Sequence, residues 1–109
     1  MWFAANRSGD HDSARALLAK DISNDVDGHR TQGFDAFMEW YVKRMAVEGP
    51  GFRYSVLDVL AGERYAAAVL RPSRADGSTW RRVDLYEIAG NVINRIIAFQ
   101  DPHPPPPNP

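Results

Sequence analysis

The stretch Thr79–Ile88, T-W-R-R-V-D-L-Y-E-I, decides the fold together with the turn Ala89-Gly90-Asn91 and the apolar run Val92–Phe99 that follow it. Two such runs joined by a short turn with glycine predict a β-hairpin. Side chains alternate between the two faces of a strand. One face of the first strand then carries Arg82, Asp84, Tyr86 and Ile88, and the other carries Arg81, Val83, Leu85 and Glu87.

Asp84 is therefore a carboxylate set among apolar neighbours. Burying a lone ionised aspartate is costly, so it must be paired with a cation, hydrogen-bonded or kept protonated. Arg82, two residues earlier on the same face, is the nearest candidate partner. Asp84 is either an acid in an apolar pocket or a structural carboxylate paired with Arg82 or Arg95, since ion-pair networks also perturb carboxylates.

Composition limits the classes of protein. A chain of 109 residues forms one domain, and 44% apolar with 25% charged residues is ordinary for a globular protein. The net charge of −1 and the pI of about 6.3 give no electrostatic reason to bind nucleic acid or an anionic membrane. Without cysteine there is no disulfide and no thiolate chemistry. With no secretory pattern and no long apolar run, we expect a cytoplasmic protein.

The first third of the chain predicts two short helices and a strand. Trp2–Ala5 is typical of the end of a helix, and Asp10 or Asp12 is expected to cap a second helix running to about Ala19. The next segment, 21–28, alternates briefly and ends at a turn, which predicts a short edge strand.

A long helix and two strands separate this region from the hairpin. From Gly33 onward, apolar residues recur at helical spacing until Gly49-Pro50-Gly51; they are Phe34, Phe37, Met38, Tyr41 and Met45. Segments 52–61 and 64–71 read as strands, and Pro72–Ser78 as a hairpin loop. Helices followed by antiparallel strands indicate an α+β fold, with the long helix on one face of a curved sheet.

The outer sheet face is expected to be apolar, with Leu57, Val59, Val83 and Leu85 pointing there. Such a face suggests a partner, and a second copy of the chain is the commonest one, so we expect a homodimer through the sheet. The proline-rich segment 102–109 is expected to be extended or disordered.

Two longer segments resemble the nuclear transport factor 2-like superfamily, which includes SnoaL-like polyketide cyclases, ketosteroid isomerases and limonene epoxide hydrolases. F-A-A-N-R-S-G-D-H-D-S-A-R-A-L-L-A-K-D (3–21) is similar to the family's first two helices, and V-D-L-Y-E-I-A-G-N-V-I-N-R-I-I-A-F-Q-D (83–101) to its last hairpin. The resemblance covers residues 1–101. It implies a cystatin-like, cone-shaped roll in which a curved, mainly antiparallel mixed sheet wraps three helices and leaves a pocket at its open end, and a shortened first helix. Many members dimerise through the sheet.

Some functional residues of the family have a matching residue in this sequence, and others do not. Asp84 falls where ketosteroid isomerases place a protonated acid in the oxyanion hole. Arg82-x-Asp84 has the spacing of an Arg and Asp that assist water addition in the epoxide hydrolases. The isomerase base falls near Val26, the isomerase tyrosine at Trp2 and a second acid of the hydrolases and cyclases near Ile97, and none of these transfers a proton as the family residues do.

The resulting site prediction is a pocket for an apolar, oxygenated small molecule, with no cofactor and no metal. Asp84 is the candidate acid or oxyanion donor, and Arg82 its electrostatic helper. The candidate ligand-binding residues are Trp2, Asn24, Phe34, Met38, Tyr54, Tyr86, Arg95 and Phe99. An isomerase, a cyclase or a hydrolase remains open, as does a non-catalytic ligand-binding or dimerisation module.

Overall fold

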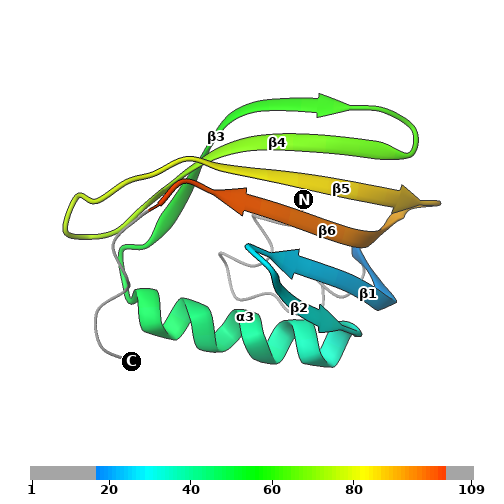
Figure 1. Ribbon diagram of the computed structural model, residues 1–109, viewed down its shortest axis with the longest axis horizontal. Helices are drawn as coiled ribbons and strands as arrows, with labels where there is room; N and C mark the ends of the chain where they lie inside the picture. Colours follow the sequence, from blue (N-terminus) through cyan, green and yellow to red (C-terminus); the bar gives the residue numbers. More distant parts are fainter. Residues whose placement is uncertain (1–16, 103–109) are drawn as a thin grey trace.

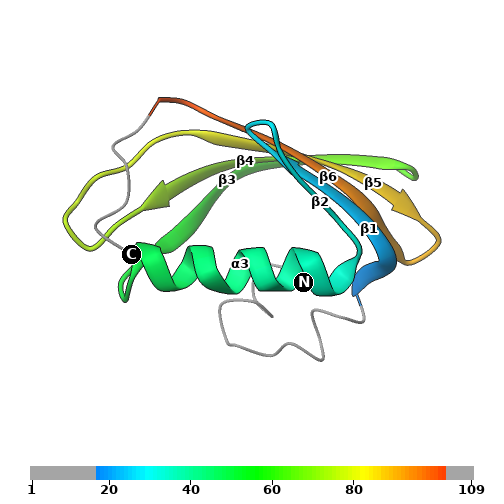
Figure 2. The ribbon, with the colours of Figure 1, turned by 60° about the horizontal axis from the view of Figure 1, so that its bottom comes forward.

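The computed structural model describes residues 17–102, which form a curved six-stranded sheet with a helix across its concave face (Figures 1 and 2). The strands lie in the order β2-β1-β6-β5-β4-β3, and every neighbouring pair is antiparallel except β1 and β6, which are parallel. The elements are β1 (Leu18–Val26), β2 (His29–Gln32), α3 (Phe34–Glu48), β3 (Arg53–Ala61), β4 (Tyr65–Ser73), β5 (Arg82–Ala89) and β6 (Val92–Gln100).

The predicted hairpin and long helix are confirmed. β5 and β6 pair from Ala89↔Val92 onward, and Gly90, with φ 62°, turns the chain between them. The helix α3 ends at Gly49, whose φ of 83° suits a residue without a Cβ. Its buried side chains pack against the concave face of the sheet, in a core that includes Ile22, Phe34, Phe37, Met38, Leu70, Tyr86 and Ile96. None of the helices in the described part is long and apolar enough to cross a membrane.

The start of the described chain differs from the prediction. β1 begins at Leu18, so the second helix cannot run to Ala19, and β1 is an interior strand between β2 and β6. The sequence Asp27-Gly28 makes a tight turn because both residues have positive φ, 50° and 86°. That turn adds β2, which takes the edge position and which alternation alone did not predict.

The expected three helices are tested only in part, because the first two fall on residues 1–16, which lie outside the described residues, as does the tail beyond residue 102. Within residues 17–102, α3 is the one helix among the named elements, and the α+β class with a curved mixed sheet is confirmed.

A bulge in β3 overturns part of the predicted alternation. The pairing with β4 shifts between Val56 and Asp58, so Leu57 is an extra residue. Beyond the bulge Val59 pairs with Ala68, which is buried on the inner side of the sheet. The prediction that Val59 belongs to the outer face was therefore wrong.

The outer face is nevertheless apolar, as predicted. The register continues from Leu60 through Ala67 to Leu85 and Ile97, so these residues share that face. Leu60 is 71% exposed, Leu85 42% and Phe99 57%. In Figure 2 the opposite, concave face is the one that α3 covers.

Candidate functional site

A cavity of about 350 Å³ lies between α3 and the inner side of the sheet. Its deep end is formed by side chains that are almost fully buried, such as Asn24, Asp84 and Ile96, whereas His29 and Asp27 are exposed and mark its mouth. The lining residues are Asn24, Val26, Asp27, His29, Phe37, Trp40, Tyr41, Arg44, Met45, Glu48, Phe52, Tyr54, Trp80, Arg82, Asp84, Ile96 and Gln100.

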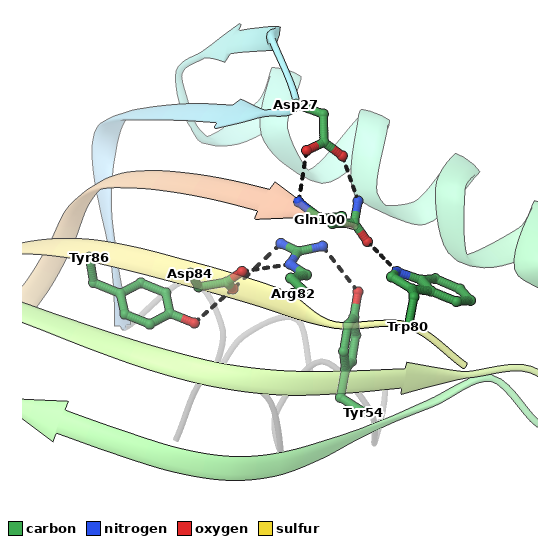
Figure 3. Close-up of polar contacts among 7 residues, drawn as sticks. All are labelled: Asp27, Tyr54, Trp80, Arg82, Asp84, Tyr86 and Gln100. Atoms are coloured by element: carbon green, nitrogen blue, oxygen red, sulfur yellow. Dashed lines mark hydrogen bonds and ion pairs between the residues drawn. The ribbon is translucent and has the colours of Figure 1, made fainter. Parts of the chain in front are cut away.

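Asp84 and Arg82 form an ion pair in this wall, because the alternation of β5 turns both side chains inward (Figure 3). Arg82 Nε donates to Asp84 Oδ1 at 2.5 Å and Nη2 donates to Oδ2 at 3.4 Å. Tyr86, also on β5, donates its hydroxyl to Asp84 Oδ2 at 2.8 Å. Asp84 is 1% exposed, and three donors satisfy its two oxygens. Its geometry is that of a carboxylate that orients Arg82.

Tyr54 on β3 completes this group on the opposite side of the guanidinium. Arg82 Nη1 donates to the Tyr54 hydroxyl at 3.4 Å, and the guanidinium carbon lies 5.6 Å from the centre of the Tyr54 ring. Burial on its own would lower the pKa of Arg82, but Tyr54 and Asp84 outweigh it and raise that pKa above its ordinary value. Burial raises the pKa of the Tyr54 hydroxyl, so Tyr54 is neutral and Arg82 remains a cation.

Asn24 supplies a second polar group at the deep end. It lies on β1, its side chain is 1% exposed, and its Nδ2 has no hydrogen-bond partner within the described structure. A buried donor without an acceptor costs about 1–3 kcal/mol. Such a donor on a cavity wall indicates a place where a bound molecule would present an oxygen.

A second charged cluster lies where α3 ends. Glu48, whose side chain is 1% exposed, accepts from Arg74 Nε at 2.6 Å and from Arg74 Nη2 at 3.4 Å. Arg44 lies one helical turn before Glu48, and its Nη2 is 3.2 Å from Glu48 Oε1. The Arg74 guanidinium also lies 4.6 Å from the centre of the Trp80 ring.

A chain of hydrogen bonds ties the mouth of the cavity to the sheet. Trp80 Nε1 donates to Gln100 Oε1 at 2.7 Å, and Gln100 Nε2 donates to Asp27 Oδ2 at 2.8 Å (Figure 3). The backbone N–H of Gln100 donates to the other oxygen of Asp27 at 3.0 Å. The β1–β2 turn, the end of β6 and the segment before β5 are thereby held together.

The structure brings four of the predicted site residues to the cavity: Asn24, Tyr54, Arg82 and Asp84. Three others, Phe34, Met38 and Tyr86, are buried in the core but do not line the cavity. Trp2 lies outside the described residues.

Arg95 and Phe99 are on the wrong side of β6 to line the cavity. The inward residues of this strand are Ile96, Ala98 and Gln100, so the two predicted residues point outward and are exposed. Neither an ion pair nor a hydrogen bond joins Arg95 to Asp84. Ile97 also belongs to the outward set, while its neighbour Ile96 lines the cavity without a group that transfers protons.

Several residues that line the cavity were not predicted from the sequence, among them Trp40, Arg44, Glu48, Trp80 and Gln100. One signal was available, since Phe37, Tyr41, Arg44 and Glu48 continue the helical stripe at spacings of three and four. A stripe traced through apolar residues alone leaves out Arg44, because its side chain is charged. Within the described residues, no group of three or more His, Cys, Asp or Glu side chains is placed to hold a metal ion.

Comparison with known proteins places this geometry in a family. No curated protein matches the sequence. A proposed ketosteroid isomerase from Kribbella flavida DSM 17836 is similar in structure, with a TM-score of 0.79 and 22% identity over 98% of this chain and 78% of that one. A proposed polyketide cyclase from Sinorhizobium meliloti gives 0.76 and 22% over 92% and 89%.

A third structure, a protein of unknown function with a cystatin-like fold from Xanthomonas campestris, gives a TM-score of 0.80 with 22% identity, covering 94% of this chain and 86% of that one. Likeness at this identity establishes the fold alone. The family model described as the SnoaL-like domain matches residues 1–96. With its curved mixed sheet and its cavity between sheet and helix, this chain belongs to the SnoaL-like domain family.

Proposed function

We propose that the cavity binds an apolar small molecule through an oxygen atom that accepts hydrogen bonds from Arg82. This proposal rests on the number of Arg82 N–H groups that the protein itself leaves without an acceptor. Arginine has five N–H groups, and the described residues engage three of them, two at Asp84 and one at Tyr54. Two N–H groups remain for a ligand, and the unpartnered Asn24 amide lines the same cavity.

Aromatic side chains supply the apolar walls. On the sheet side the Phe52 ring lies 5.1 Å from Tyr54 and 6.1 Å from Trp80, between ring centres. On the helix side Phe37 stacks on Tyr41 at 6.0 Å. A cavity of about 350 Å³ is at the small end of ligand sites. A planar, largely apolar molecule with one carbonyl, enol or phenol oxygen suits this combination.

The chemistry that the site favours is stabilisation of negative charge on that oxygen. Arg82 is a fixed cation held in an apolar wall, where such a charge acts more strongly than in water. Asp84 orients it and is a positioning residue. An isomerase, cyclase or hydrolase would also need a group that moves a proton, and the family resemblance puts such groups near Val26 and Ile97, whose side chains cannot transfer one. The relatives' routes of proton transfer are therefore not carried over, and ligand binding is the function that we propose.

The first experiment is a thermal-shift screen against steroids, terpenoids, aromatic polyketide-like compounds and small epoxides, followed by a turnover assay on every hit. A ligand well above its dissociation constant raises the melting temperature by mass action. A hit that is consumed would favour the enzyme over the binding protein. No hit from any class would contradict the proposed function and favour an interaction module.

Variants then separate binding from folding. Asp84→Asn leaves the buried Arg82 without its counter-charge, and we expect it to cost about 3–5 kcal/mol in the free energy of unfolding. The paired variant Arg82→Met with Asp84→Leu removes both charges and should recover much of that loss. The paired variant should fold and yet no longer be stabilised by the hit. Retained stabilisation would show that the ligand does not use Arg82.

A further inference from the structure

The Arg44–Glu48–Arg74 cluster has an excess of positive charge. Glu48 and Arg74 are both buried, with side chains 1% and 4% exposed, and they form a two-point ion pair through Nε and Nη2 of the arginine. Such a pair is complete in itself, since the fork of the guanidinium matches both carboxylate oxygens. The buried anion is thus already neutralised before Arg44 is counted.

Arg44 is the surplus cation, and it borders the cavity. Its contact with Glu48 is a single one at 3.2 Å, and its side chain remains 35% exposed. Two arginines around one glutamate leave the cluster with one net positive charge. In contrast, Arg82 and Asp84 at the deep end balance each other. The charge on the cavity wall is therefore uneven, with its positive excess toward the end of α3.

Among the described residues, Arg44 forms its ion pair with Glu48, and no other carboxylate of the wall is paired with it. Asp27 is the remaining lining carboxylate, and Gln100 donates to both of its oxygens. His29 stacks on Trp40, with ring centres 5.7 Å apart. Burial raises the pKa of the Tyr54 hydroxyl most; among the charges, Arg82 and Arg44 lower this pKa and Asp84 and Glu48 raise it, so both charged clusters act on the same side chain.

We infer that the cavity selects an apolar molecule that carries two polar groups: a hydrogen-bond-accepting oxygen for Arg82 and Asn24, and a carboxylate or comparable anion for Arg44. This inference rests on the proposed function and adds the ligand class to it. Arg44 is the specificity residue for the anionic group, because its guanidinium is partly exposed and its fork can hold a carboxylate at two points.

Matched pairs of acids and methyl esters test this ligand class. We would titrate the full chain with 6-hydroxy-2-naphthoate, 2-naphthoate, biphenyl-4-carboxylate and 4-phenylbutyrate, and with the methyl ester of each, by isothermal calorimetry at low and at high salt. For the series that binds, the acid should bind about tenfold more tightly than its ester, and salt should narrow that difference.

Arg44→Gln should weaken binding of the acid by about the same tenfold and so abolish the preference for the acid over its ester. Lys43→Gln is the matched control, because Lys43 is the neighbouring cation on α3 and is exposed, paired with Glu39 at 3.1 Å. It should keep the preference. Circular dichroism would confirm that both variants fold.

Two outcomes would overturn the inference, and they are distinguishable. If the esters bind as tightly as the acids and Arg44→Gln changes neither affinity, the cavity binds ligands as proposed, but the inference that Arg44 binds an anionic group is wrong. If no acid and no ester binds, the inference fails; a hit in the thermal-shift screen would then leave the proposed binding function standing, and no hit there would contradict that function as well.

Discussion

Tyr86 shows how one buried hydroxyl depends on its carboxylate neighbour. Burial raises the pKa of Tyr86 above its ordinary value of 10, and the adjacent Asp84 raises it further. The folded protein therefore keeps this proton at pH values where the unfolded chain releases it. The stability that Tyr86 contributes is complete below pH 10 and is lost as the pH rises above 10.

We expect wild type to lose unfolding free energy more steeply than Tyr86→Phe as the pH rises above 10, with the difference approaching about 1.4 kcal/mol for each pH unit. Urea unfolding of both proteins at pH 9, 10 and 11 measures this difference. Parallel losses in the two proteins would mean that Tyr86 ionises as readily in the folded state as in the unfolded one.

The residues of the site differ in how far the sequence predicts them. Arg82, Asp84 and Tyr86 lie two residues apart on one strand, so alternation alone places them on one face, and in the structure Asp84 accepts hydrogen bonds from both of the others. Glu48 and Arg74 are 26 residues apart, and their contact depends on the path of the β4–β5 connection. The local sequence pattern does not predict the course of that connection.

Gly33 fixes where the helix begins. Its φ of 90° and ψ of 154° lie in a region that is open to glycine and closed to other residues without strain. A Cβ built there meets no atom within 4 Å, so the cost of Gly33→Ala is one of backbone conformation alone. We expect a loss of about 1–3 kcal/mol in unfolding free energy, measured by urea denaturation. An unchanged midpoint would contradict the strain at this position.

The strands show why the periodicity of apolar residues predicts where a strand lies in the sequence better than it predicts how that strand pairs with its neighbours. Segment 52–61 was correctly predicted as a strand, but its alternation ran on through Leu57, where the structure has a bulge. An extra residue reverses the side to which every later side chain points. Likewise, segment 21–28 has the acidic pattern of an edge strand, and its position beside β6 follows from a parallel pairing that no local feature encodes.

The exposed outer face leads us to propose a homodimer. Leu60, Leu85 and Phe99 are large apolar side chains on this face, each more than two-fifths exposed. Light scattering after gel filtration should give twice the chain mass of 12.2 kDa. The double variant Leu85→Glu with Phe99→Glu should elute as a folded monomer, because two like charges would face their copies across the interface.

Val42→Glu is the control for that variant. Val42 is 46% exposed but lies on α3, away from the outer face, so the change should leave the mass unchanged. A wild-type mass of one chain would contradict the dimer.

The fold class was predictable from the order of helices and strands, because this order is a property of the chain itself. The parallel contact between β1 and β6 was not, and it has a consequence for how the protein is made. Asp25 pairs with Ile97, which lies 97 − 25 = 72 positions later. The hairpins and α3 are built from contacts between residues close in sequence, so they can form early. The pairing of β1 with β6 closes a much longer loop and is therefore delayed. During synthesis β1 must wait for almost the entire chain to emerge from the ribosome before its interior edge is covered.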